Sequence, residues 1–190
     1  MVDEDLQRLL EESGAILKGH FLLTSGRHSD TYFEKFRVLE RPDVLSRLCS
    51  NLASSFPTGI DLVVGPTTGG IIVAFEVARQ MGLPSLYVES ENGERKLRRG
   101  GTIEKGARFL VVDDVYTTGR SIREVIELLT AMGGVLAGVG VLIDRSENRT
   151  DWGAPFASAH RVKAVSFDPS EVPEWLSAVP VTKPGTRIEK

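Results

Sequence analysis

The sequence predicts an α/β fold in which a parallel β-sheet is covered by helices on both faces. Short apolar segments alternate with helical patterns through the middle of the chain, the order that parallel strands and crossover helices require. Two of these apolar segments lead directly into polar loops that contain glycine. The chain has 190 residues, which is enough for one domain with a substantial core.

The first forty residues lie outside this alternation. Residues 3–13 carry three leucines on one helical face, and Gly14 is a helix stop. Residues 15–38 are mixed, because polar residues interrupt every short apolar stretch. A second helix is expected from Pro42 to about Phe56, since Pro-Asp favours a helix start.

The alternating elements then follow in order, and they predict a core sheet of about five strands. The charged stretch 89–102 has no apolar period and is expected to be a loop. The tail after Ser170 is expected to be a surface extension with a short helix near Trp175. The expected strands are 60–64, 85–88, 108–112, 135–143 and 162–167, and the expected helices are 69–81 and 121–132.

Composition narrows the class of protein. The net charge is −3, which does not favour a nucleic-acid partner. No apolar run is long enough for a membrane span, and the acidic start is unlike a signal peptide, so a cytoplasmic location is expected. The single cysteine, Cys49, lies in a helical apolar pattern and is interpreted as a buried thiol that forms neither a disulfide nor a zinc site.

The most informative segment runs from Phe109 to Ser121. An apolar strand leads into adjacent carboxylates, Asp113 and Asp114, and then into a hydroxyl-rich loop and a helix. Ser121 and Glu124 have the spacing of a capping box. Amides at a helix start, with hydroxyls beside them, bind anions, so we expect a phosphate in the loop and a sugar diol at the acids. The alternative is a strand-turn-helix with solvated aspartates.

Two further segments suit the same ligand. Residues 63–70 also leave a strand through a glycine-rich turn and enter a helix, although an ordinary turn has this composition too. The charged stretch 89–102 holds a basic cluster flanked by glycines, which favours a mobile cationic lid over a phosphate. The alternative is a solvated charged loop. The cluster consists of Arg95, Lys96, Arg98 and Arg99.

The segment 109–121 resembles the phosphoribosyl pyrophosphate (PRPP) motif of type I phosphoribosyltransferases. The resemblance implies that Asp113 and Asp114 bind the ribose, and that a strained non-proline peptide occurs in the 63–70 loop. The implied ribose-phosphate ligands are Asp113, Asp114, Val115, Tyr116, Thr117, Thr118, Gly119, Arg120 and Ser121. The implied pyrophosphate ligands are Thr67, Thr68, Gly69, Arg95 and Lys96. Asp113, Asp114, Arg98 and Arg99 are the implied catalytic residues.

Nearly the whole chain is similar to orotate phosphoribosyltransferases. The similarity lies in residues 19–33, 97–100, 138–146 and 183–187. It implies that an arginine, Arg145, meets the orotate carboxylate. The forked guanidinium group of arginine is suited to bind a carboxylate through two hydrogen bonds. Without the resemblance, Arg145 reads as a strand-end arginine paired with Asp144 or Glu147. The implied orotate-binding residues are Thr117, Arg145, Ser25, Gly26, Tyr32 and Phe33.

The family implies one phosphoribosyltransferase domain over residues 1–190. Its hood would comprise mainly residues 1–40 and the C-terminal segment, and its core about 41–168. The implied activity transfers the phosphoribosyl group of PRPP to orotate, giving orotidine 5′-monophosphate and pyrophosphate for pyrimidine synthesis. Mg²⁺ would be bound mainly through PRPP, without a direct protein ligand, and a homodimer would share its active sites. The alternatives are an enzyme for a purine or uracil, and a PRPP-fold regulator without catalysis.

The sequence also departs from the family pattern. Many family members carry lysine at the positions of Thr24 and Gly69, and many have a longer lid rich in lysine and histidine. A Cys-Pro-x-Cys segment common in the most similar branch is replaced by residues 171–175. The missing lysines and the different lid bear on which cation faces pyrophosphate. The missing cysteines remove any metal or redox role for the tail.

Overall fold

The computed structural model describes residues 4–23, 25–56, 58–91, 94–97, 101–146, 148–162 and 165–184. The chain divides into two compact units. The first unit joins the two ends of the chain, residues 1–40 and 163–190, and the second is the continuous segment from Arg41 to Val162. Each unit is described by itself.

The second unit is built on a six-stranded sheet of order β5-β4-β3-β6-β7-β8. All neighbouring strands are parallel except β4 and β5, which form an antiparallel pair at one edge. The five parallel strands match the number expected, and every residue of β3 is buried, as a strand covered on both faces requires. The strands are β3 (Leu62–Pro66), β4 (Ser85–Glu91), β5 (Glu94–Leu97), β6 (Arg108–Tyr116), β7 (Val135–Asp144) and β8 (Phe156–Arg161).

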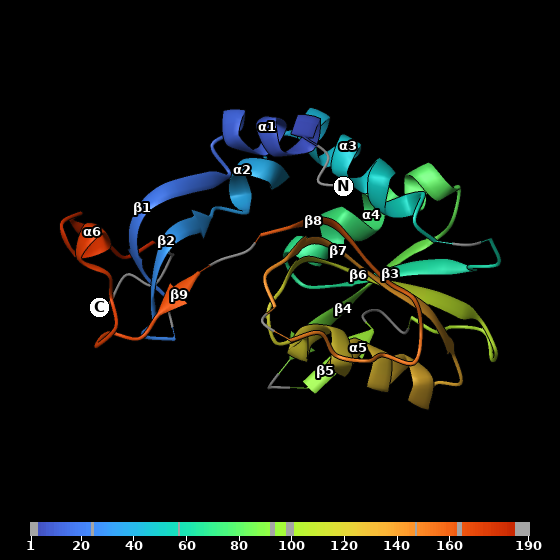
Figure 1. Cartoon of the computed structure of the whole chain (residues 1–190). Helices are drawn as coiled ribbons and strands as arrows, with labels where there is room; N and C mark the ends of the chain where they lie inside the picture. Colours follow the sequence, from blue (N-terminus) through green and yellow to red (C-terminus); the bar gives the residue numbers. More distant parts are fainter. Residues whose placement is uncertain are drawn as a thin grey trace. The chain divides into compact units, whose positions relative to one another are not determined.

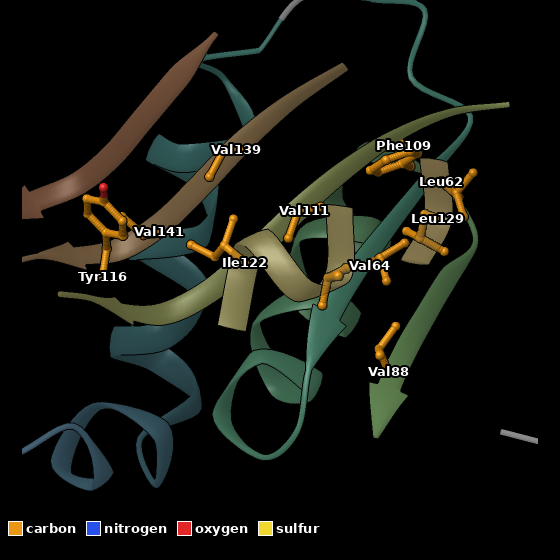
Figure 2. Packing of buried hydrophobic residues seen from close by; sticks show 11 residues of the cluster. Leu62, Val64, Val88, Phe109, Val111, Tyr116, Ile122, Leu129, Val139 and Val141 are labelled. Atoms are coloured by element: carbon orange, nitrogen blue, oxygen red, sulfur yellow. The ribbon is translucent and has the colours of Figure 1, made fainter. Parts of the chain in front are cut away.

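Helices cover both faces of this sheet, and Figure 1 shows α3 (Pro42–Ala53) and α4 (Gly69–Met81) on the opposite side from α5 (Arg120–Ala131). Helix α4 ends at Gly82, which adopts the left-handed conformation expected of a helix stop. Figure 2 shows the apolar cluster between α5 and the sheet, in which Ile122 and Leu129 meet alternate residues of the strands. This core fixes the carboxyl ends of β3, β6 and β7, where the polar loops begin.

The first unit contains a four-stranded sheet of order β10-β1-β2-β9. Its central pair, β1 (Ile16–Leu22) and β2 (His28–Phe33), is antiparallel, whereas β10 (Val181–Thr182) runs parallel to β1. Strand β9 (Ser166–Phe167) pairs with β2. The helices of this unit are α1 (Glu4–Glu12), α2 (Phe36–Leu39) and α6 (Glu174–Ser177).

Several elements differ from the sequence expectations. Residues 89–102 are not wholly a loop, because β4 continues to Glu91 and β5 pairs back onto it. The strand expected at 162–167 is wrong as a strand of the core sheet. The last strand of that sheet, β8, ends at Arg161, before the expected segment begins, and β9, which lies within the segment, belongs to the first unit. Residues 165–168, expected in the core, therefore belong with the N-terminal segment.

The cysteine is a buried core residue, as expected. Cys49 lies on the inward face of α3 and has no exposed surface. Burial, and secondarily the charge of Glu76, raises the pKa of its thiol to about 12. The thiolate that nucleophilic chemistry needs is therefore scarce at neutral pH. Among the helices in the described part of the chain, none is both long and apolar enough to cross a membrane.

Candidate active site

The carboxyl ends of three adjacent strands carry most of the residues singled out in the sequence. Strand β3 leads into residues 67–70, β6 into residues 117–121, and β7 into Arg145. Because β6 lies between β3 and β7, these three exits share one edge of the sheet. Open parallel sheets bind their ligands at this edge.

The acidic pair lies within the last part of β6 and not after it. Asp113 pairs across the ladder with Val141, and the strand continues to Tyr116. The Asp113 carboxylate accepts a hydrogen bond from the Asp114 amide at 2.8 Å, and the Asp114 carboxylate accepts one from the Val115 amide at 2.7 Å. Both residues are buried, with exposed fractions of 8% and 6%. Burial argues against the alternative of two merely solvated aspartates.

The acidic pair lies directly against the loop that follows β3. A Cβ atom placed on Gly69 would come within 1.8 Å of Oδ2 of Asp114, and one on Gly70 within 3.1 Å of Oδ1 of Asp113. The first residues of α4 and the two carboxylates are therefore in contact. Amides at a helix start favour nearby negative charge, which suits these buried acids. The Thr67–Thr68 peptide in this loop is cis, in keeping with the unusual peptide implied there.

The loop after β6 turns sharply at Gly119. This glycine caps α5 with φ of +74° and ψ of +10°, a left-handed conformation that other residues rarely adopt. The first helical hydrogen bond runs from the Arg123 amide to the Gly119 carbonyl, so the amides just before Arg123 have no partner within the helix. Thr117 and Thr118 are exposed in the loop. The loop thus places backbone amides and exposed threonines at one helix start, and its binding of an anion stays a prediction.

The capping box predicted for Ser121 and Glu124 is wrong. Helix α5 begins at Arg120, one residue earlier, and its cap is the backbone of Gly119. Glu124 instead accepts hydrogen bonds from Nε of Arg120 and Nε of Arg95, both at 2.7 Å. These two guanidinium groups, Arg120 first, hold the pKa of Glu124 below its usual value. Glu124, whose spacing from Ser121 suggested a capping box, is therefore the counter-ion of two arginines.

The basic cluster is divided between described and undescribed residues. Arg95 lies on β5 and is mostly buried in its ion pair with Glu124, whose helix follows the 117–121 loop. Lys96 is about half exposed and lies 3.7 Å from Glu91 and 3.5 Å from Glu94. Arg98 and Arg99, implied as catalytic, lie outside the described residues. The structure thus connects one predicted pyrophosphate ligand, Arg95, to the helix that follows the 117–121 loop.

The Tyr116 side chain does not face the ligand edge. It is 1% exposed and its ring joins the apolar cluster beneath α5, at the end of the cluster marked by Val141 (Figure 2). A contact of Tyr116 with the ribose phosphate would therefore have to come from its backbone. That backbone is engaged too, because its carbonyl accepts a hydrogen bond from the Arg145 amide at 2.8 Å. The bond fixes Arg145 beside the 117–121 loop.

The other residues implied in orotate binding belong to the first unit. Ser25 and Gly26 form an exposed turn between β1 and β2. Tyr32 and Phe33 are neighbours on β2 and point to opposite faces, and Phe33 is 4% exposed. The two rings therefore cannot both pack on one side of a base. Thr24 lies outside the described residues.

Arg27 has a structural role that sequence patterns did not indicate. Its guanidinium donates to the Ser166 hydroxyl and carbonyl and to the Asp168 carboxylate, each at 2.8 Å. The arginine thereby fastens the β1–β2 turn to the C-terminal segment. Only the Ser-Gly-Arg turn composition could have drawn attention to it.

Comparison with known proteins agrees with this geometry. Residues 38–172 match the model of the phosphoribosyl transferase domain. The chain is 46% identical to the orotate phosphoribosyltransferase of Pelotomaculum thermopropionicum, over 98% of this chain and 99% of that protein. The chain belongs to the orotate phosphoribosyltransferase family. It therefore has the type I phosphoribosyltransferase fold and is a transferase.

Solved structures of the family agree. The crystal structure of orotate phosphoribosyltransferase from Aeropyrum pernix matches with a TM-score of 0.73 and 31% identity, covering 83% of this chain and 94% of that one. The enzyme from Mycobacterium tuberculosis, in complex with inorganic phosphate, matches with a TM-score of 0.62 and 25% identity, covering 83% of this chain and 96% of that one.

Proposed function

We propose that this phosphoribosyltransferase transfers the phosphoribosyl group of PRPP to orotate, giving orotidine 5′-monophosphate and pyrophosphate in pyrimidine synthesis. The observation that carries the proposal is the contact between the acidic pair and the Gly69 loop at the carboxyl edge of the sheet. It unites the proposed diol-binding pair with the helix start proposed for pyrophosphate, and the strand that carries the pair leads into the helix start proposed for the 5′-phosphate.

Each part of PRPP has a proposed partner. Asp113 and Asp114 accept hydrogen bonds from the ribose hydroxyls, and residues 117–121 hold the 5′-phosphate through the amides at the start of α5. Residues 67–69 hold pyrophosphate through backbone amides and the two threonine hydroxyls. Lys96, Arg98 and Arg99 supply positive charge to the leaving pyrophosphate. Arg95, which is bound to Glu124, orients β5, the strand that also carries Lys96.

The reaction breaks the C1′–O bond while positive charge develops on the ribose, as in glycoside chemistry. Two negatively charged carboxylates near the ribose stabilise that charge, and cations at the other end stabilise pyrophosphate as it leaves. The orotate nitrogen then attacks C1′. No covalent enzyme intermediate is needed, consistent with the unreactive state of Cys49.

Mg²⁺ is the proposed cofactor, held mainly through PRPP oxygens. In the described part of the chain no three metal-ligating side chains cluster together. A cation that takes most of its ligands from substrate and water fits such a site, since Mg²⁺ commonly uses few protein ligands. When bound, it would neutralise charge on pyrophosphate.

Loss of orotate absorbance in the presence of PRPP and Mg²⁺ tests the proposal directly. We expect turnover with orotate and little with uracil, hypoxanthine or adenine. A preference for a purine or uracil would replace orotate as the substrate. PRPP binding without any turnover would favour the regulator alternative, for which the net charge of −3 gives no basic RNA face.

Arg145 is the proposed ligand of the orotate carboxylate. Arg145→Ala should lower kcat/KM for orotate about ten- to a hundred-fold, because a charge-assisted hydrogen bond is worth about 1.5–3 kcal/mol. PRPP binding, measured by calorimetry without base, should change little. Arg145→Lys should rescue poorly, since lysine lacks the fork. Arg108→Ala, at the opposite end of β6, is the matched control. Lost PRPP binding with retained orotate selectivity would contradict the assignment.

We also propose a homodimer whose active sites are shared. Helix α4 leaves Ile72 41% and Phe75 63% exposed, at a spacing of three residues and so on one side of the helix. An exposed apolar face on the helix that begins at the pyrophosphate loop suits contact with a second copy. Phe75→Asp should therefore sediment as a monomer, and its activity should be reduced. Trp175→Asp, which changes an exposed aromatic residue of the first unit, should remain dimeric.

Sharing of the sites has its own test. An Asp114→Asn protein mixed with an Arg98→Ala, Arg99→Ala protein should recover part of the activity if the lid of one subunit serves the site of the other. Failure to recover activity in a mixture proven to exchange subunits would leave each site complete within one chain. A cytoplasmic location, and the absence of membrane and nucleic-acid partners, belong to the same proposal.

A further inference from the structure

The space beside the Gly119 turn is occupied by two aromatic rings, one of them from a different segment. A Cβ atom on Gly119 would lie 2.7 Å from Cε2 of Tyr116 and 2.9 Å from both Cζ2 and Cη2 of Trp152. Trp152 belongs to the connection between β7 and β8, outside every segment that the family resemblance singled out. Its ring, together with that of Tyr116, therefore fills the space beside the turn that a side chain would otherwise take. Packing of this kind restricts the backbone of a glycine, the most mobile residue type.

The Trp152 ring is itself held by neighbours on β6 and α5. Tyr116 meets it edge-on, with ring centroids 6.2 Å apart, and the Arg123 guanidinium lies 5.6 Å from the ring centre. The Tyr116 hydroxyl donates to the Thr150 hydroxyl at 3.0 Å and accepts from the Thr150 amide at 3.1 Å. Tyr116 thus holds Thr150, in the segment that contains Trp152. Trp152 in turn packs beside the loop that follows Tyr116.

The indole N–H takes no part in this arrangement. Nε1 of Trp152 is buried and has no hydrogen-bond partner among the described residues. A buried donor without a partner is unfavourable, so the ring is kept in place by shape and by its aromatic and cationic neighbours. Phenylalanine should therefore replace much of its function, whereas alanine should not.

We propose that Trp152 is a positioning residue that keeps the 5′-phosphate loop, residues 117–121, in its anion-binding conformation before PRPP arrives. The inference rests on the proposed function of that loop. Without the ring, Gly119 regains alternative conformations, and PRPP binding has to order the turn and the amides at the start of α5. The consequence falls on PRPP affinity and not on the chemical step.

Steady-state kinetics separate this role from a general structural one. Trp152→Ala should raise KM for PRPP about ten-fold, the effect of ordering one or two loop residues on binding. The kcat value and KM for orotate should stay within about twofold. Trp152→Phe should restore KM for PRPP to within about threefold of the wild-type value. Trp175→Ala, in the first unit, should leave both KM values unchanged. A folded Trp152→Ala protein with unchanged KM for PRPP would overturn the inference.

Direct binding of ribose 5-phosphate, followed by calorimetry, tests the loop without catalysis. Wild-type protein should bind it about ten-fold more tightly than Trp152→Ala. The chain has two tryptophans, so Trp175→Phe leaves Trp152 as the only one. The fluorescence emission of Trp152 should then change as ribose 5-phosphate is added, with the same midpoint as the calorimetric titration. If the Trp152→Ala protein does not fold, the affinity of Trp152→Leu for ribose 5-phosphate and this emission change test the inference instead. Equal binding by variant and wild type would defeat the inference alone. Absence of both binding and orotate turnover in wild-type protein would defeat the proposed function as well.

Discussion

Asp114→Asn should lower kcat/KM for PRPP by about 100- to 1,000-fold while the protein stays folded. The Asp114 carboxylate is 6% exposed at the carboxyl edge of the sheet and touches the start of α4. A neutral amide there would lose up to two charge-assisted hydrogen bonds to the ribose, worth about 1.5–3 kcal/mol each. It would also lose the negative charge that stabilises the developing ribosyl cation.

The measurement is steady-state kinetics with PRPP varied at saturating orotate, together with a thermal melt. Asp43→Asn is the matched control, because it removes the same charge from an exposed residue that pairs with Arg41 at the start of α3. That control should alter kcat/KM by less than about twofold. Wild-type kinetics in the Asp114→Asn protein would remove the acidic pair from the ribose site, and with it the main support for the proposed chemistry.

Gly69→Ala should be nearly as damaging, although it adds only a methyl group. Its Cβ would lie 1.8 Å from Oδ2 and 2.5 Å from Cγ of Asp114, so the carboxylate or the loop has to move by more than an ångström. A displacement of that size at a reacting group costs about 100-fold in rate. Alanine has a higher helix propensity than glycine, so the substitution should not unfold α4. Loss of activity without a large loss of helix would therefore point to displacement of Asp114.

A double-mutant cycle makes this prediction specific. If Gly69→Ala acts by displacing Asp114, then adding it to Asp114→Asn should lower kcat/KM by much less than about 100-fold. Non-additivity is expected only for residues that act through one contact. Full multiplication of the two losses would instead indicate that Gly69 serves pyrophosphate independently of the acid. Any larger side chain at residue 69 would meet the same contact in the loop conformation seen here.

The sequence predicted best those elements in which local and tertiary preferences agree. Helix α4 spans residues 69–81 as expected, since an apolar periodic segment ends there at a glycine that adopts the left-handed conformation. Strand β7 was also predicted to within one residue, because a long buried run leaves no other option. The acidic pair, the two loops and their meeting at one edge follow from the parallel order of strands.

What the sequence did not predict depends on contacts between distant segments. Strand β5 is polar and forms only because β4 offers an open edge for pairing. Strand β8, Phe156–Arg161, has small and polar residues without alternation, and β7 orders it. Glu124 was interpreted as the partner of Ser121 in a capping box because one of its actual partners, Arg95, is 29 residues away in sequence. Trp152 carried no local signal at all.

The division of the chain into two units has a consequence for biosynthesis on the ribosome. The segment from Arg41 to Val162 is continuous, so its sheet can form while the rest of the chain is still being made. The first unit cannot be completed then, because β9 and β10 follow that segment in the chain and pair with β2 and β1. Until those residues have emerged, β1 and β2 remain a two-stranded hairpin, which is marginal in water. A nascent chain would thus acquire its proposed PRPP-binding edge before the proposed orotate-binding residues of its first unit are in place.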